Sequence, residues 1–276
     1  MSSGHAMPGK ADFAAAYAGP DPRGYFRALA PYEYLTPHHA QRVFRLLTAA
    51  RAPRAVVDLC CSYGVNAALL NHQLTLAELY HRYTDPALDS LSAEELTLRD
   101  RQFYAARRRP EAVPVIGVDV ATGPVDHARR AGLLDAAFAE NLERAAPSPA
   151  LRALLADVGL VTVTGGVGYV SERSFDHLLA CTASPPWVAA FALRAVPYGP
   201  VAEVLAEYGL VTERAAGTFP QRRFTGPEER AGALRAAVEA GLDPAGLEEE
   251  GWYHAALYVS RPAAQVTARP LATLLR

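Results

Sequence analysis

The sequence predicts a doubly wound α/β sheet that is mostly parallel and closes with an antiparallel strand. Short, continuous apolar runs alternate with helical stretches along the 276 residues, and such runs suit strands that are covered on both faces. Hydrophobic residues make up 50% of the chain, which is enough for one large core. We expect a helical cap at 11–50, then an α/β domain at 51–276 with a helical insertion at about 74–110.

The N-terminal region is expected to be helical because apolar and aromatic residues are interleaved with charged ones. Thr36-Pro37 is a typical helix start, since proline is favoured at the first helical position, and this helix should run to about Arg51. The first six residues, MSSGHA, are interpreted as an expression scar and are left out of the fold.

Seven strands are expected, and the strand-helix alternation favours right-handed crossovers between the parallel ones. The last strand and one before it should be antiparallel. The expected strands are 55–61, 113–120, 136–142, 160–166, 187–196, one within 212–225, and 252–261. The expected helices that follow or separate them are 66–74, 126–134, 150–159, 171–182, 201–209 and 227–241.

One connection is far longer than the others. About 40 residues separate the first helix from the second strand, whereas ordinary connections have roughly 4–6 residues. This stretch should form two helices, Leu76–Tyr83 and Ala93–Arg108, separated by the segment TDPALDS. We therefore interpret it as an insertion rather than a loop.

Composition excludes several classes of function. The net charge of −2 and the pI of about 6.5 lack the basic footprint of a nucleic-acid binder. The three cysteines form no C-x-x-C pair, so no metal site and no disulfide framework are expected. We see no signal peptide and no apolar run near the roughly 18 residues that span a membrane. A cytoplasmic protein with a small-molecule partner, and with neither nucleic acid nor membrane, is the expectation.

Lysine is almost absent from the chain. Lys10 is the only one, and it lies in a start that we expect to be disordered. Pyridoxal phosphate enzymes bind their cofactor through a buried lysine, so the sequence argues against that class.

The stretch VVDLCCSYGVNAALL, residues 56–70, has the pattern of a strand, a tight turn and a helix. Ligands of open α/β sheets bind at the carboxyl ends of the strands, and Asp119 stands at the end of the second strand. A carboxylate at that place commonly binds ribose hydroxyls. The fingerprint G-x-G-x-x-G is absent, which disfavours NAD.

This arrangement resembles the class I S-adenosylmethionine-dependent methyltransferases, whose sheet is Rossmann-like. Their first motif is an acid followed by alternating glycines: Asp58 matches the acid, Cys60 and Ser62 replace two glycines, and Gly64 matches the third. The second stretch, GVDVATGPVDHARRAGLLDAAFAENLE, is similar to the family over 117–143. The resemblance covers about 55–169 and the closing antiparallel strands.

The resemblance implies S-adenosylmethionine as cofactor. Asp58 would hold its amino group, Gly64 would let the helix start approach its carboxylate, and Asp119 would accept from the ribose. Cysteine and serine are small enough for the loop, although they adopt a positive φ less readily than glycine. A buried turn without a ligand, and a helix cap at Asp119, remain alternatives. The implied cofactor-binding residues are Asp58, Cys60, Ser62, Gly64, Asp119, Val120, Asn141, Leu142 and Gly165.

Tyrosines are the candidates for chemistry, because aromatic faces stabilise a sulfonium cation. Among 13 tyrosines, Tyr63 and Tyr169 are the catalytic candidates, and Tyr25 and Tyr32 are expected in the substrate pocket with Tyr34 nearby. Other signals are discounted. His38-His39 and His177 suit surface or core positions, and the pair Cys60-Cys61 lacks the nearby ordered base that a nucleophile needs. The stretch SPPW at 184–187 is similar to the D/N-P-P-Y/F/W motif of amino methyltransferases, but it precedes the fifth strand whereas that motif follows the fourth.

Three hypotheses follow. The first is methyl transfer to a small molecule in a closed pocket. The second is cyclisation of the aminobutyrate arm of the cofactor with release of methylthioadenosine, giving an azetidine or, with a stronger base, a cyclopropane carboxylic acid. The third is a scaffold that binds the cofactor without catalysis, or has lost it.

Overall fold

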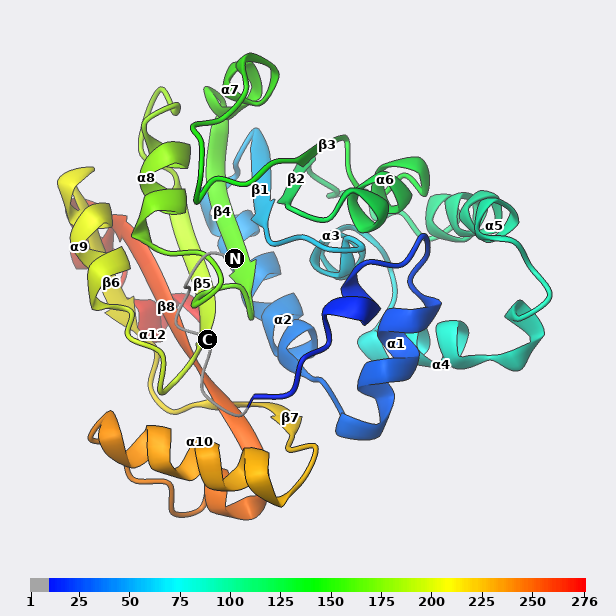
Figure 1. Cartoon of the computed structure of the whole chain (residues 1–276). Coiled ribbons are helices and arrows are strands. Elements are labelled where there is room, and N and C mark those ends of the chain that lie inside the picture. Colours follow the sequence, from blue (N-terminus) through cyan, green and yellow to red (C-terminus); the bar gives the residue numbers. More distant parts are fainter. Residues whose placement is uncertain (1–9) are drawn as a thin grey trace.

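The computed structural model of the protein describes residues 10–276, so the interpretation of MSSGHA lies outside the described residues. Its strands form a single sheet (Figure 1). They are β1 (Ala55–Leu59), β2 (Val115–Asp119), β3 (Ala136–Ala139), β4 (Val158–Thr164), β5 (Trp187–Leu193), β6 (Leu210–Arg214), β7 (Phe219–Arg223) and β8 (Trp252–Pro262).

The sheet order is β3-β2-β1-β4-β5-β8-β6, and β7 also pairs with β8. The first five strands in this order are parallel, whereas β8 is antiparallel to β5, β6 and β7. The chain runs outward from β1 in one direction and from β4 in the other, so the order reverses between these two strands. The predicted fold class is confirmed, and the reversal marks the usual place for a ligand.

Helices cover both faces of the sheet and form the cap and the insertion. The α-helices are α1 (Arg23–Leu29), α2 (Thr36–Arg51), α3 (Val65–Asn71), α4 (Leu76–Thr84), α5 (Ala93–Ala105), α6 (Thr122–Arg130), α7 (Pro149–Leu155), α8 (Glu172–Leu179), α9 (Gly199–Glu207), α10 (Pro227–Glu239), α11 (Ala263–Ala268) and α12 (Leu271–Leu274). The short 3₁₀ helices are η1 (Ala14–Tyr17), η2 (Ala30–Tyr32), η3 (Pro86–Leu88) and η4 (Glu248–Glu250).

Each face of the sheet has its own hydrophobic core. One core joins the strands to α7, α8 and α9, and the other joins them to α2, α3 and α6. All seven residues of β5 are buried, as its continuous apolar run predicts for a central strand. A third cluster packs α1 of the cap against α4 and α5 of the insertion, and these elements lie together at one side of the sheet (Figure 1).

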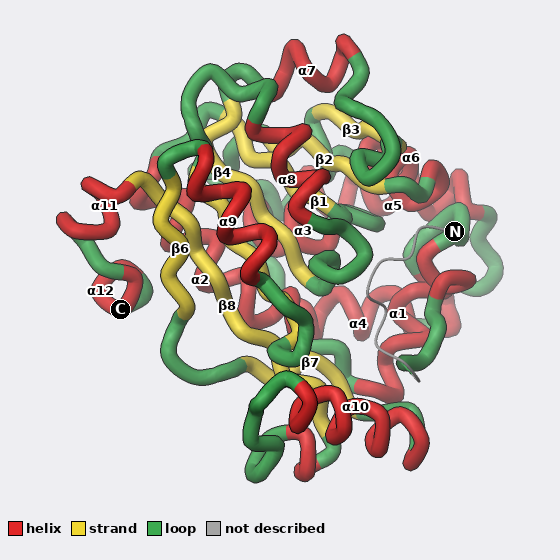
Figure 2. The backbone as a smooth tube through the Cα atoms, turned by 60° about the vertical axis from the view of Figure 1, so that its left-hand side comes forward, coloured by secondary structure: helices red, strands yellow, loops and turns green. Residues whose placement is uncertain are grey.

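The antiparallel edge differs from the prediction, which placed one strand within 212–225. Two short strands, β6 and β7, pair end to end along the eleven residues of β8, and the sheet has eight strands instead of seven (Figure 2). Gly217 adopts a φ of +75° between them, so the chain bends where a single strand would continue. The helices α11 and α12 after β8 were also not predicted.

No helix among residues 10–276 combines the length and the apolar character that are needed to cross a membrane.

Candidate functional site

A cavity of about 410 Å³ lies at the carboxyl ends of β1, β2 and β4, where the strand order reverses. We call its two walls the floor and the roof. The floor consists of the loops that follow these three strands, with Asn66 of α3. The roof is the segment of residues 10–34, which crosses the strand ends before α2 begins; Figure 1 shows it in dark blue. Pro37 of α2, Val65 of α3, and Gln221 and Arg222 of β7 complete the lining.

The loop after β1 has an unusual backbone. Cys60, Ser62 and Gly64 all have positive φ, at +60°, +47° and +72°. These are the three positions at which the resembling family has glycine, so the backbone has the form that glycine favours although two of the residues carry side chains. Cys60 and Ser62 therefore adopt a positive φ here, although cysteine and serine do so less readily than glycine.

Asp119 joins two loops of the floor. Its Oδ2 accepts a hydrogen bond from the Ser62 N–H at 2.9 Å, and its Oδ1 accepts one from the Ala121 N–H at 3.0 Å. The first residue before α6 is Ala121, and α6 has no side-chain cap, so Asp119 organises the turn without capping the helix. The half-buried carboxylate and the neighbouring Val120, 64% exposed, both line the cavity.

Asp58 lies behind the lining in a polar cluster. Its Oδ1 accepts hydrogen bonds from Asn66 Nδ2 at 2.9 Å and from Thr162 Oγ1 at 3.0 Å, whereas its Oδ2 has no partner among the described residues. Burial raises the pKa of Asp58 to about 7, and the bonds from Asn66 and Thr162 offset only part of this effect. Asn66 also donates to Thr164 Oγ1 at 3.0 Å, and both of these residues line the cavity. Asn66 therefore stands between Asp58 and the cavity.

Aromatic side chains form much of the roof. Tyr17 and Tyr25 meet edge to face with ring centroids 5.0 Å apart, and both line the cavity with Phe13 and Tyr34. Burial raises the pKa of Tyr34 to about 12, so its hydroxyl stays neutral. A Cβ atom on Gly165 would lie 3.0 Å from that hydroxyl, and Gly165 has a φ of +67°, so glycine is needed there for two reasons.

Side chains anchor the roof at several points, two of which are Glu229 and Tyr63. Glu229 of α10 accepts the Ala11 N–H at 2.7 Å while it forms a buried ion pair with Arg222. At the other point, the Tyr63 hydroxyl donates toward the carbonyl oxygens of Ala16 at 3.2 Å and Gly19 at 3.0 Å. Burial opposes ionisation of Glu229, but the hydrogen bonds from Arg222 and the backbone outweigh it and lower its pKa to about 2.

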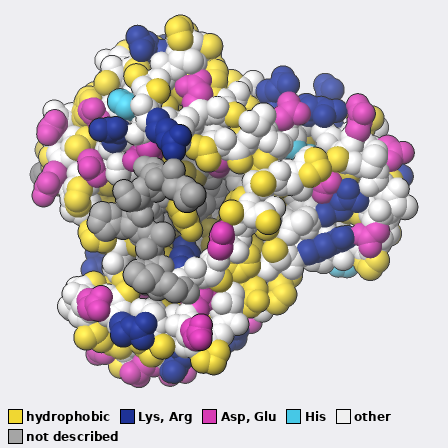
Figure 3. Space-filling view, viewed as in Figure 1, with side chains coloured by type: hydrophobic (Ala, Val, Ile, Leu, Met, Phe, Trp, Pro, Cys, Tyr) yellow, Lys and Arg dark blue, Asp and Glu magenta, His cyan; other side chains and the backbone are white. Residues whose placement is uncertain are grey.

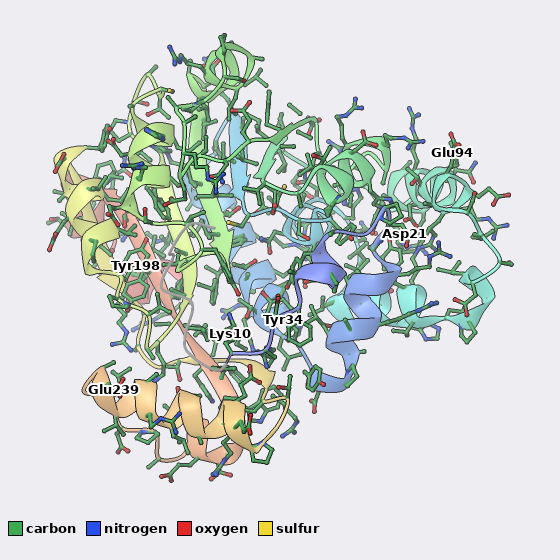
Figure 4. All side chains as sticks on the ribbon, in the orientation of Figure 1. Lys10, Asp21, Tyr34, Glu94, Tyr198 and Glu239 are labelled. Carbon is green, nitrogen blue, oxygen red and sulfur yellow. The ribbon has the colours of Figure 1, made fainter. Side chains whose placement is uncertain are left out.

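Lys10 is placed differently from the expectation of a disordered start. It lines the cavity, and its Nζ lies 5.2 Å from the ring centroid of Tyr169 (Figure 4 labels Lys10 and Tyr34 near the strand ends). Burial, with a contribution from the nearby Arg222 charge, lowers the pKa of Lys10 to about 8. This correction also removes the argument that the sequence offered against pyridoxal phosphate, because that argument depended on the position of Lys10.

The cavity brings together only part of the residues expected from the sequence. Tyr63 and Gly64 lie outside the lining because the Tyr63 hydroxyl holds the roof and Gly64 begins α3. The residues expected from the sequence that line the cavity are Tyr25, Tyr34, Cys60, Ser62, Asp119, Val120, Gly165 and Tyr169. The others that lie outside the lining are Tyr32, Asp58, Asn141 and Leu142.

Several lining residues were not expected from the sequence. Asn66 had a usable signal, since it follows Gly64 by two residues in the first turn of a helix that begins at the cavity. The other polar ones depend on tertiary contacts: Lys10, Asp12, Tyr17, Thr164, Gln221 and Arg222.

The surface around the site carries no basic patch on the face that Figure 3 shows, where acidic and basic side chains are interspersed. No group of three or more potential metal-ligating side chains was found in the part of the chain that the structure describes. The groups that line the cavity are aromatic rings, hydroxyls, amides, carboxylates, two cysteine thiols, and the cationic side chains of Lys10 and Arg222.

Neither a family model nor a curated protein matches the sequence. Among solved structures, the YcgJ protein from Bacillus subtilis is 12% identical, with 82% of this chain and 99% of that chain covered and a TM-score of 0.45. Magnesium protoporphyrin IX methyltransferase from Synechocystis PCC 6803 is 12% identical over 81% and 79%, with a TM-score of 0.40. Geranyl diphosphate C-methyltransferase from Streptomyces coelicolor A3(2) is 12% identical over 82% and 79%, with a TM-score of 0.41. At these scores we infer no function from the likeness.

Proposed function

We propose that the chain is an S-adenosylmethionine-dependent enzyme that transfers a methyl group to a small molecule in this cavity. The observation that carries the proposal is the floor: three alternate residues with positive φ, tied to Asp119 at the point where the strand order reverses. This combination suits an adenosyl ligand. Its ribose hydroxyls would donate to the Asp119 carboxylate, and its methionine part would lie along the turn of small residues after β1.

Two buried polar atoms support the fit of this cofactor. Asp58 Oδ2 and Ser62 Oγ have no hydrogen-bond partner among the described residues, and leaving such atoms unpaired is costly. The hydroxyls of a ligand would supply a partner for Ser62 at this floor, and its ammonium group would interact with Asp58, which lies behind Asn66, through a bridging water. Asp119 would hold the ribose, and Asn66, which lies in front of Asp58, would face the amino acid end. Val120 would lie along the adenine.

The aromatic residues of the roof are consistent with methyl transfer from a sulfonium cation. When bound, the cofactor supplies a methyl group on a positively charged sulfur, which is already a strong electrophile. Phe13, Tyr17, Tyr25 and Tyr34 line the cavity, and aromatic faces stabilise cations by about 0.5–2 kcal/mol. The same side chains exclude water, so alignment with the acceptor can provide most of the acceleration.

The acceptor needs little help from a base. No histidine is among the described residues that line the cavity, and the carboxylates of Asp12 and Asp119 already accept backbone hydrogen bonds. Among the described residues that line the cavity, Lys10, with a pKa of about 8, is the amine able to accept a proton near neutral pH. We therefore favour an acceptor atom that is nucleophilic once a single weakly held proton is lost.

Cyclisation of the cofactor is the second candidate, and the size of the cavity favours it. Ligand sites have volumes of roughly 300–1,000 Å³, so about 410 Å³ leaves limited room for an acceptor beside the cofactor. In this reaction the α-amino nitrogen, after losing a proton, attacks the γ-carbon. The bond from that carbon to sulfur breaks, methylthioadenosine leaves, and azetidine carboxylate forms. A cyclopropane product would need a carbon nucleophile and a stronger base.

Incubation of the protein with S-adenosylmethionine alone, followed by product identification by mass, separates the candidates. S-adenosylhomocysteine formed only with an added acceptor would support methyl transfer. Methylthioadenosine formed without an acceptor, well above the level with heat-inactivated protein, would replace methyl transfer by cyclisation. If calorimetry shows no binding of the cofactor, both enzyme proposals fail and a scaffold that has lost the cofactor remains.

A further inference from the structure

The cavity has a second polar region, away from the carboxylate that would hold the ribose. Asp119 ends β2, whereas β7 pairs with β8, which lies beyond β4 and β5 in the sheet. Gln221 and Arg222 of β7 therefore line the cavity at the end away from Asp119. Lys10 of the roof belongs to the same end, because the charges of Arg222 and Glu229 both act on its ammonium group. We call Lys10, Gln221 and Arg222 the polar corner.

The ammonium group of Lys10 has no counter-ion. It forms no ion pair or hydrogen bond with the described residues, and Glu229 is already paired with Arg222. Asp12 lines the cavity too, but its carboxylate accepts a backbone N–H of its own turn. Residues 1–9, MSSGHAMPG, contain no Asp or Glu, so they bring no carboxylate side chain. A half-buried cation without a partner is unfavourable, and an anionic ligand would supply one.

Gln221 and Arg222 have donors that the protein does not use. Gln221 is only 3% exposed, and its side-chain amide has no hydrogen-bond partner among the described residues. Its Nε2 lies 3.8 Å from a Cβ atom built on Gly165, so it faces the loop after β4. Three of the five N–H donors of Arg222 bond to Glu229 and to the Arg223 carbonyl oxygen. The corner is therefore rich in donors and lacks acceptors for them.

We propose that the methyl acceptor is a small carboxylic acid whose carboxylate binds at the polar corner. A carboxylate accepts several hydrogen bonds at once and carries one negative charge. One charge is what the corner lacks, because Glu229 balances Arg222 and leaves only the charge of Lys10. Phe13 and Pro37 line the same cavity and suit an apolar remainder of the acceptor. This inference rests on the proposed methyl transfer and names the class of its acceptor.

The proposal agrees with an acceptor that needs little help from a base. A carboxylic acid has lost its proton well below neutral pH, so it arrives as an anion. Burial lowers the pKa of Lys10 to about 8, which still leaves Lys10 mainly charged at pH 7. An anion beside it would favour the charged form further. Lys10 would then bind the acceptor.

Calorimetry on the full chain saturated with S-adenosylhomocysteine tests the corner with matched probes. Benzoate and phenylacetate are compared with their neutral amides, benzamide and phenylacetamide, and phenyl phosphate is the probe with a higher charge. Lys10→Met removes the cation, Lys10→Arg keeps one, and Gln221→Leu removes the amide. Arg230→Met, which changes an exposed cation of α10 outside the lining, is the control. Arg222 stays unchanged because its loss would leave the buried Glu229 unpaired.

The natural chain should bind each carboxylate at least about tenfold more tightly than its amide. Lys10→Met should abolish this preference, whereas Lys10→Arg and Arg230→Met should keep most of it. Gln221→Leu should weaken the carboxylates about fivefold, the value of one hydrogen bond. Affinity of the natural chain for benzoate should fall as the pH rises above about 8, where Lys10 loses its charge, and Lys10→Met should lack this fall.

The proposal is overturned if neither carboxylate binds the natural chain more tightly than its amide, or if Lys10→Met keeps the full preference. Tighter binding of phenyl phosphate than of benzoate would overturn the choice of a carboxylate. If Lys10→Met weakens S-adenosylhomocysteine but not methylthioadenosine, which lacks the amino acid group, the corner holds the carboxylate of the cofactor itself and the proposal is wrong. Failure of the underlying function looks different: the natural chain would not bind S-adenosylhomocysteine.

Discussion

The floor and the roof of the cavity are built on different principles. The floor consists of loops that leave parallel strands in a buried sheet, and the Asp119 carboxylate ties two of these loops together. The roof, residues 10–34, contains only one short α-helix and two 3₁₀ turns, and a few side chains hold it in place. The floor is therefore fixed by the sheet, whereas local opening of the roof should cost less free energy.

The largest expected effect comes from the anchor of the roof. Glu229→Ala removes the partner of the buried Arg222 and the acceptor of the Ala11 N–H. Leaving a buried cation unpaired should lower the free energy of unfolding by roughly 3–5 kcal/mol. Denaturant unfolding measures this loss, and Glu228→Ala, which changes an exposed neighbour in the same helix, is the control.

The pH dependence checks that the ion pair is the cause. Glu229 has a folded pKa of about 2 against an ordinary value of 4.5, so its contribution is complete above about pH 4.5 and is lost as the pH falls toward 2. The natural chain should lose this part of its stability in acid, and Glu229→Ala should not. A variant that keeps the same acid sensitivity as the natural chain would rule out this role.

The next effect concerns the floor. Asp119→Ala removes two hydrogen bonds that hold the loops and, by the proposal, the acceptor for the ribose. Hydrogen bonds to a charged group contribute about 1.5–3 kcal/mol, so affinity for S-adenosylmethionine should fall roughly 10- to 100-fold. Calorimetry measures it, with Asp126→Ala on the outer side of α6 as control. Unchanged affinity in Asp119→Ala would refute the proposed cofactor site.

Asp58 gives an effect with the opposite dependence on pH. The folded chain holds the Asp58 proton up to about pH 7, while the unfolded chain releases it near 3.8. Stability without ligand should therefore decrease as the pH rises between these values, by up to about 1.4 kcal/mol per pH unit. Asp58→Asn cannot ionise, so it should lack this slope and be more stable than the natural chain at pH 8. Unfolding titrations across this pH range measure the slope, and equal slopes in the two chains would exclude Asp58 as its source.

The floor could largely be predicted from the sequence, because it depends on local patterns. Apolar runs locate the strands, and a carboxylate at the carboxyl end of a strand, as at Asp119, must lie at the edge where the other parallel strands end. The conformation of Cys60 and Ser62 could not be predicted. Their intrinsic preference opposes positive φ, and only the tertiary structure, including the bond from Ser62 to Asp119, imposes it.

The roof could not be predicted because its contacts are distant in sequence. Tyr32 and Tyr34 are separated by one residue, yet only Tyr34 lines the cavity; Glu33 between them has a φ of +50°, which changes the chain direction. Arg222 reaches the cavity from β7, whose pairing with β8 includes an irregularity after Pro220. Nothing in the local sequence reports such a register.

The prediction with the smallest expected effect tests whether Tyr63 anchors the roof or takes part in the chemistry. Tyr63→Phe removes the hydroxyl that donates to the Ala16 and Gly19 carbonyl oxygens, at a cost of about 0.5–1.5 kcal/mol. Because the bonds join the roof to the loop after β1, amide hydrogen exchange in the roof should accelerate severalfold while exchange in β1 stays unchanged. Tyr32→Phe, outside the lining, is the control. If Tyr63→Phe instead abolishes turnover while roof exchange stays slow, Tyr63 acts in the chemistry and the roof is held by its other contacts, such as that of Glu229 with the Ala11 N–H.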